Sequence, residues 1–229
     1  MEVKHPVPTT RDLFEHLKKI DKNYFINVIT HLVDKNMISK ELTYDTCYYS
    51  KCGITALTVI RYFYEYFNIY DKNDKISVKL NTNDIDSLLQ ISVSQKNFAI
   101  LCEFEDGDDV EHCLVIIKGM TDEYIIAQSY YSQYYFDPNN ENSLKLLTAT
   151  EYEKFMHKCK ILLNNRRMDD SYKNIWHELT GVKLSEHNHK KSFLEIRSTI
   201  FPFSKQQINT NNNFLQLQKR KITRLLSKL

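Results

Sequence analysis

The chain has 229 residues, 42% of them hydrophobic and 26% charged, which is enough for one globular core and marginal for two. Every apolar run falls short of the roughly 18 to 20 residues of a membrane-spanning helix, and four Gly and four Pro exclude collagen-like or low-complexity order. With 31 basic and 29 acidic residues, the chain as a whole is not a strong binder of polyanions.

Apolar side chains at a helical period predict several helices in the first part of the chain. Thr9 and Asp12 have the spacing of an N-terminal cap, and Ser50 is a candidate N-cap for a strongly apolar helix. The helices expected in this part cover residues 9–20, 22–37, 52–68 and 83–94.

The pattern then changes to extended apolar runs. Residues 97–104 and 111–117 predict two strands, and the second is expected to be central because it is apolar on both faces. Residues 124–136 hold a third strand or a pair of strands. Helices followed by an antiparallel meander predict an α+β fold.

The last part of the chain carries weaker signals. A capping box at Thr148 opens a helix over residues 149–163, and a further helix is expected near residues 170–180. We expect residues 1–163 to form the core and residues 164–229 to form a basic helical extension.

Charge is distributed unevenly along the chain. Residues 1–159 carry 17 Lys/Arg and 24 Asp/Glu, whereas residues 160–229 carry 14 and 5. An amphipathic basic helix expected over residues 214–229 suits an acidic partner or an anionic membrane surface, or the acidic body of the same chain. Nucleic-acid binding through residues 190–229 has charge as its sole argument, because no recognition motif is present.

The five Cys are odd in number and include no CxxC pair, so we expect neither a disulfide framework nor a structural zinc site. Cys102 and Cys113 lie in apolar runs and are expected to be small core residues. His187 and His189 form an HNH tripeptide, for which an exposed loop is the simpler interpretation. We expect no metal or other cofactor. Free thiols and an N-terminus without the apolar stretch of a secretory signal predict a cytoplasmic location.

A Cys-Gly pair opens the strongly apolar helix expected over residues 52–68. A thiol at a helix N-terminus feels the positive end of the helix dipole and the free N–H groups of the first turn, so the pKa of Cys52 is expected to fall. The same N–H groups suit an oxyanion. Gly53 leaves room for a substrate backbone, while a buried structural thiol at Cys52, with Cys47 as a rival exposed thiol, is the competing interpretation.

His112 begins an otherwise apolar strand, and Gln128 and Ser129 end the next one. A lone His of this kind is more often a core or edge residue. If the two strands form a hairpin centred on Met120, His112 and Gln128 face each other across the sheet. The Gln128 oxygen then accepts the ring N–H and leaves the other ring nitrogen to take a proton from Cys52. A slip of one residue brings in Ser129 instead.

This order of residues resembles the papain-like cysteine peptidases over residues 44–136: Cys-Gly at a helix start, His at a strand start, and a polar residue sixteen positions later. The resemblance implies N-terminal helices packed on a central antiparallel sheet. It also implies that Cys52 is the nucleophile, His112 the general base and Gln128 the third member, where the family usually has Asn or Asp. That superfamily includes peptidases, deubiquitinating enzymes, deamidases, transglutaminases and acyltransferases.

The chain departs from that family in two ways. Asp137 is the nearest carboxylate and, with Ser129, an alternative third member. The family often places a Gln that lines the oxyanion hole a few residues before the nucleophile, and this chain has Asp45 in that stretch. The expected oxyanion hole is therefore formed by the backbone N–H of Cys52 and by Asp45, which cannot donate a hydrogen bond when ionised.

Two main functions follow. The first is a thiol enzyme, such as a cysteine protease, deubiquitinase-like enzyme or deamidase, acting on an amide or isopeptide bond of a protein or peptide substrate. The second is a catalytically inactive papain-like module that binds a protein partner or an anionic membrane. The abundance of Lys over Arg (24 against 7) and the 19 Asn indicate an AT-rich genome, as in a bacterial effector or a large virus acting in a host cytoplasm.

Overall fold

The computed structural model describes part of the chain, namely residues 8–21, 24, 48–66, 78–80, 85–106, 109–130, 136–164, 169–181 and 195–202. The helices are α1 (Thr10–Leu17), α4 (Tyr48–Tyr66), α5 (Ile85–Ser94), α6 (Ala149–Asn164) and α7 (Asp170–Thr180). The strands are β1 (Val78–Leu80), β2 (Phe98–Asp106), β3 (Asp109–Lys118), β4 (Glu123–Gln128), β5 (Leu144–Thr148) and β6 (Glu195–Pro202).

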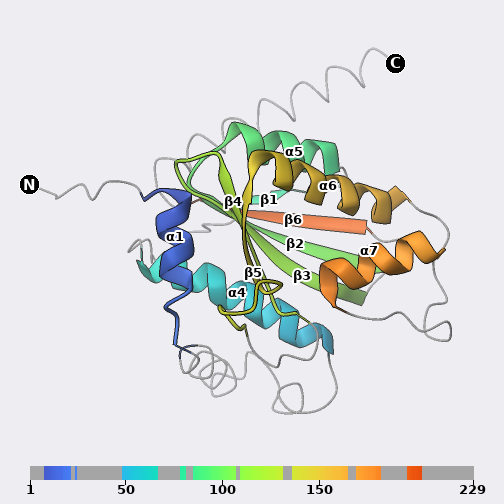
Figure 1. Cartoon of the computed structure of the whole chain (residues 1–229), viewed down its shortest axis with the longest axis horizontal. Coiled ribbons are helices and arrows are strands. Elements are labelled where there is room, and N and C mark those ends of the chain that lie inside the picture. The colour runs from blue at the N-terminus through green and yellow to red at the C-terminus, as the bar shows by residue number, and fades with distance from the viewer. Residues whose placement is uncertain are drawn as a thin grey trace, which may run out of the picture.

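These strands form one antiparallel sheet in the order β1-β6-β2-β3-β4-β5, with helices on both sides (Figure 1). The consecutive neighbours β2, β3 and β4 make the expected meander, which β5 extends, and the α+β class is confirmed. The β3 strand pairs with β2 on one side and β4 on the other. Its central position explains why both of its faces are apolar.

Helices α1 and α4 pack on one face of the sheet. The predicted cap of α1 is confirmed, because the Thr9 side chain accepts from the Asp12 N–H and the Asp12 carboxylate accepts from the Thr9 backbone N–H. The apolar stripe of this helix lies in one buried cluster with residues of α4 and with alternate residues of β3, of which Cys113 and Val115 are two.

Helices α5, α6 and α7 cover the opposite face. The capping box at the start of α6 is also confirmed: Glu151 accepts from the Thr148 N–H at 2.8 Å. The other set of β3 side chains, including Leu114 and Ile116, packs with these three helices. Trp176 of α7 lies in the same cluster.

The region after α7 corrects the expected division of the chain. Residues 195–202 form a strand that pairs with β1 and β2, so this part of the predicted helical extension over residues 164–229 belongs to the central sheet. The sequence pattern also missed β1 and β5. Apart from Tyr24, the helix expected over residues 22–37 lies outside the described residues, as do the helix expected over residues 214–229 and His187 and His189.

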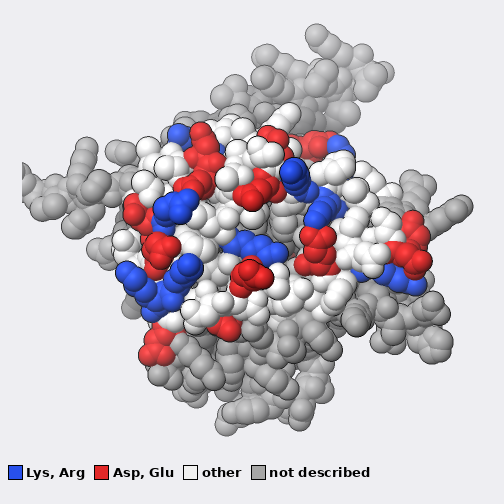
Figure 2. Space-filling view, in the orientation of Figure 1, with Lys and Arg blue, Asp and Glu red and all other residues white. Residues whose placement is uncertain are grey.

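Charged side chains of both signs are interspersed on the face seen in Figure 2. Among the residues coloured there, neither Lys/Arg nor Asp/Glu covers a large continuous area. The described part of this face therefore offers no single-sign surface of the kind that attracts a polyanion.

Candidate active site

The Gln128 side chain is held in one orientation by two backbone carbonyls. Its Nε2 donates to the oxygen of Leu179 at 2.8 Å and to that of Asn142 at 3.0 Å. Leu179 lies in the last turn of α7, which ends at Gly181 in the left-handed conformation, with φ of 78°. Since carbonyls only accept, both amide hydrogens are used and Oε1 must face the other way.

Gln128 Oε1 faces the ring of His112, and His112 Nε2 lies 2.8 Å from it. The ring nitrogen must donate this bond, because the amide oxygen is an acceptor, so the proton of neutral His112 is on Nε2. The other nitrogen, Nδ1, is buried and lacks a hydrogen-bond partner in the part of the chain that the structure describes. This nitrogen is therefore able to accept a proton.

Aromatic rings enclose this pair. The rings of Phe104 and Trp176 lie 6.5 and 6.3 Å from the imidazole, measured between centroids. The imidazole is only 2% exposed. A hydrogen bond that is shielded from water in this way is stronger than the same bond in solvent, so the tautomer of His112 is firmly fixed.

The predicted contact between His112 and Gln128 is present, but its expected register is wrong. The cross-strand partner of Gln128 is Leu114, and Ile117 pairs with Ile125, so the hairpin is centred on Thr121 and not on Met120. The shift moves the partner by two residues, which keeps the same face of the strand. His112 consequently reaches Gln128 along the diagonal.

Cys52 lies against the same segment of β3. Its side chain is 3% exposed and belongs to the cluster between α4 and the sheet, whereas His112 contacts Trp176 on the other face. The β3–β4 pairing begins at Leu114. His112 precedes this pairing and lies near enough to the Cys52 thiol to lower its pKa.

Two residues stabilise the thiolate of Cys52. The side chain of Cys113 contributes most, and the nearby His112 ring and the backbone N–H of Cys113 contribute further. Together they lower the pKa of Cys52 from its usual value to about 5, although burial acts in the opposite direction. A thiol with this pKa is ionised at neutral pH.

The cause of this low pKa differs from the one that the sequence suggested. Helix α4 begins at Tyr48, so Ser50 lies within the helix and is not its N-cap. Cys52 is the fifth residue of the helix, and its N–H is directed at the carbonyl of Tyr48. The backbone N–H of Cys52 is therefore engaged in the helix and not free for an oxyanion. Asp45, its expected companion, lies outside the described residues, as does the rival thiol Cys47.

The alternative third members occupy other settings. Asp137 accepts a hydrogen bond from the Asn139 N–H at 2.9 Å, within the turn before β5. Ser129 directly follows β4 and is half-buried. The hydrogen bond donated by His112 Nε2 is accepted by Gln128, the residue that ranked first in the sequence.

Two features of the site were missed. The sequence treated Cys113 as a core residue only, and in the structure it contacts Cys52 as well as being buried. The carbonyls of Asn142 and Leu179 that hold Gln128 are backbone groups, which no sequence motif marks. Successive side chains of a strand point to opposite faces of the sheet, so Cys113 and His112 face opposite sides. This alternation was the one signal in the sequence that Cys113 faces α4.

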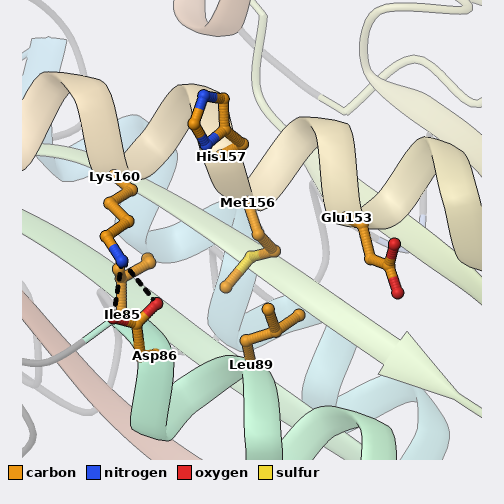
Figure 3. Close-up of a pocket in the computed structure, with 7 residues that line it drawn as sticks. All are labelled: Ile85, Asp86, Leu89, Glu153, Met156, His157 and Lys160. Atoms are coloured by element: carbon orange, nitrogen blue, oxygen red, sulfur yellow. Dashed lines mark hydrogen bonds and ion pairs between the residues drawn. The ribbon is translucent and has the colours of Figure 1, made fainter.

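A hollow on the described surface lies away from these residues. It encloses about 230 Å³ between α5 and α6, where Met156 and Leu89 point toward each other and Lys160 pairs with Asp86 at 2.6 Å (Figure 3). It contains no member of the Cys52 group. Within the ranges that the structure describes, no group of three or more His, Cys, Asp or Glu side chains is arranged to hold a metal ion.

A scan of family models and comparisons with curated proteins and with solved structures gave no match to this chain. None of the described helices is both long enough and apolar enough to cross a membrane.

Proposed function

We propose that this protein is a thiol enzyme that attacks an amide or isopeptide bond of a protein or peptide. The observation that carries the proposal is the His112–Gln128 hydrogen bond of 2.8 Å beside the thiol of Cys52. The two hydrogen bonds that the Gln128 amide group donates turn its oxygen toward His112. The ring proton of His112 is therefore on Nε2, and Nδ1 is left as the base. A nucleophile, a base and a group that orients the base are the three parts of a catalytic triad.

Each residue then has a defined role in the reaction. The Cys52 thiolate attacks the substrate carbonyl carbon, and its proton is held by His112. That proton passes to the leaving amine as the C–N bond breaks and a thioester forms on Cys52. Water, or another acceptor, then attacks the thioester, and the thiolate is restored. Gln128 orients the imidazole without exchanging a proton itself.

The resemblance to papain-like cysteine peptidases supports the same roles for these three residues. In this proposal α4 carries the nucleophile, β3 the base and β4 the third member. The choice between hydrolysis, deamidation and acyl transfer depends on which acceptor reaches the thioester.

A second function is favoured by the burial of Cys52. With 3% of its surface exposed, the thiol reacts with a large substrate only if the atoms that cover it are displaced. A papain-like module that binds a partner and does not catalyse needs no such displacement. In that case Cys52 and His112 are core residues.

An electrophilic thiol probe distinguishes the two functions. The full chain is treated at about pH 6 with a chloroacetamide probe and with a ubiquitin-derived electrophile, and labelled peptides are mapped by mass spectrometry. The enzyme proposal expects labelling of Cys52, loss of labelling in Cys52→Ala, and cleavage of a peptide or isopeptide substrate that depends on Cys52 and His112. Cys102 and Cys159 are internal controls, because burial raises the pKa of both thiols. A Cys52 that stays unlabelled in a folded chain without activity rejects the enzyme and supports the binding module.

A further inference from the structure

Cys52 and Cys113 form a pair of thiols in direct contact. They come from α4 and β3, both are buried in the cluster between these elements, and neither forms a disulfide in the structure. The side chain of each one shifts the pKa of the other, downward for Cys52 and upward for Cys113. A Cβ atom built on Gly53, the residue next to Cys52, would lie 3.8 Å from the Cys113 sulfur, which shows how closely α4 approaches β3 here.

We propose that this pair is a site of reversible oxidative modification, at which a peroxide converts Cys52 and Cys113 into a disulfide. The inference deepens the proposed function, since the modified sulfur is the proposed nucleophile and the disulfide would block it. The oxidation itself requires no catalytic activity toward a substrate.

The electrostatics of the pair favour this reaction. The hydrogen bond from Cys113 keeps the proton on Cys113 and the charge on Cys52, so the pKa of the Cys113 thiol is raised while that of Cys52 falls. Thiolates are the species that peroxides oxidise. The pair therefore presents one ionised sulfur and, in contact with it, one thiol that can react next.

The chemistry proceeds in two balanced steps. The Cys52 thiolate attacks one oxygen of hydrogen peroxide, the O–O bond breaks, and the products are a sulfenic acid and hydroxide, which becomes water by taking up a proton. The Cys113 sulfur then attacks the Cys52 sulfur, the S–O bond breaks, and the departing oxygen takes the Cys113 proton to leave as water. Two thiols lose two electrons in total, and the peroxide is reduced to two water molecules.

The opposite face of the sheet provides a matched control. Cys102 and Cys159 are also buried, each being 1% exposed, and they lie together in the cluster under α5, α6 and α7. Burial raises the pKa of both thiols, to about 12 for Cys102. Neither is ionised at neutral pH, so this second pair is not expected to react with peroxide.

The test uses the folded full chain. It is treated with hydrogen peroxide, its remaining thiols are alkylated, and a digest without reductant is analysed by mass spectrometry. The expected product is a linked Cys52–Cys113 peptide that dithiothreitol removes, together with a loss of Cys52 alkylation that dithiothreitol restores. In Cys113→Ser no link forms and Cys52 proceeds to sulfinic acid, whereas Cys102→Ser forms the link as the wild type does.

The wild-type experiment keeps the proposal falsifiable even if a variant does not fold. It is overturned if folded wild-type protein yields Cys52 sulfinic acid, or unmodified Cys52, without the link. It is also overturned if the Cys52–Cys113 link in the folded protein is no more abundant than the other cysteine pairings that form when a urea-unfolded sample is oxidised in the same way. A chain that forms the link but has no activity on any substrate rejects only the proposed function, and an active chain that forms no link rejects only this inference.

Discussion

His112 and Gln128 share a hydrogen bond of 2.8 Å although they are not cross-strand partners. Gln128 pairs with Leu114, two residues further along β3. Residues separated by two positions in a strand face the same side, so His112 and Leu114 lie next to each other below the end of β4. The amide of Gln128 is long enough to span this diagonal, and its length explains why a Gln occupies the position.

The role of Gln128 is tested by its replacement with alanine. Gln128→Ala removes the acceptor that fixes His112, so cleavage of substrate is expected to fall on the order of 10²-fold. Alkylation of Cys52 by iodoacetamide is expected to fall less, because Cys113 contributes more than His112 to the low pKa of this thiol.

The difference between these two readouts separates an orienting role from a structural one. General unfolding would expose Cys52 and would alter the rates of cleavage and of Cys52 alkylation together. Thermal melting of the variant measures such unfolding directly. Gln95→Ala, on the loop after α5, is the control and should leave both rates unchanged. Equal activity in Gln128→Ala and wild type would remove Gln128 from the mechanism.

The reactivity of Cys52 should depend on pH in a way that reflects its thiolate. Because the pKa of Cys52 is lowered to about 5, its alkylation rate is expected to be half-maximal near that pH, to decline below it as the thiol is protonated, and to be constant above about pH 7. Burial raises the pKa of Cys102 to about 12, so this thiol stays unreactive over the same range. Peptide-resolved alkylation from pH 4 to pH 9 measures both, and a Cys52 midpoint of about 8 to 9, the range of an ordinary thiol, contradicts the prediction.

The neighbour that contributes most to this low pKa is Cys113. Cys113→Ala removes its hydrogen bond to a charged sulfur, which is worth about 1.5 to 3 kcal/mol, so the pKa of Cys52 should rise by about 1 to 2. Cys113→Ser retains a hydroxyl donor and should shift the alkylation midpoint less. Cys102→Ala makes the same change in size on the opposite face and serves as the control. If both Cys113 variants keep the wild-type alkylation midpoint, the backbone N–H of Cys113 and the His112 ring are sufficient to lower the pKa of Cys52.

Local signals predicted the elements that build the site. The caps at Thr9 and Thr148 and the double-sided apolar pattern of β3 depend on neighbouring residues, and all three are confirmed. Strand β6 was missed because its pairing is entirely non-local: it is inserted between β1 and β2, which lie about a hundred residues earlier in the chain. A short strand with mixed polarity carries little signal of its own.

The prediction of the candidate site from the sequence was limited in the same way, because part of the site depends on non-local contacts. His112 and Gln128 were found because alternation along two adjacent strands constrains which residues share a face, and an error of two residues in register preserved that face. The clamp on Gln128 depends on the carbonyl of Leu179, which α7 brings from 51 residues away. Local sequence patterns do not predict that two residues this far apart in the chain come into contact.

Lys118 provides a test of the fold away from the site. It is completely buried at the end of β3, where its Nζ donates to the carbonyls of Ser92 and Val93 at the end of α5 and to the Tyr124 hydroxyl. Lys118→Met keeps the apolar stem but leaves the Val93 carbonyl without this donor, while the Ser92 carbonyl keeps only its bond from the Tyr124 hydroxyl. The free energy of unfolding should fall by about 1 to 3 kcal/mol, as measured by urea denaturation.

A surface lysine is the matched control for that change. Lys158 pairs with Glu178 on α7, and both side chains are partly exposed to solvent. Exposed ion pairs contribute less than about 1 kcal/mol, so Lys158→Met should change the stability by no more than that. If the two variants are equally stable, the Lys118 contacts do not hold α5 on the sheet.

Two glycines should respond in opposite ways to alanine. A Cβ atom on Gly119 would lie 2.7 Å from the backbone nitrogen of Thr10 and 2.9 Å from the backbone oxygen of Pro8, so Gly119→Ala must displace the start of α1 and should cost about 1 to 3 kcal/mol. At Gly53 the nearest atom is the Cys113 sulfur at an ordinary contact distance. Because alanine is the better helix former, Gly53→Ala should be neutral or stabilise α4 by up to about 1 kcal/mol.

Urea denaturation of both glycine variants measures these changes, and activity adds a second readout for Gly53. If Gly53→Ala is as stable as the wild type yet cleaves substrate more slowly, the methyl group obstructs the approach of a substrate backbone to Cys52. Unchanged cleavage would mean that this glycine serves the close packing of α4 on β3 alone. A Gly53→Ala variant less stable than Gly119→Ala would contradict the packing of both helices on this face of the sheet.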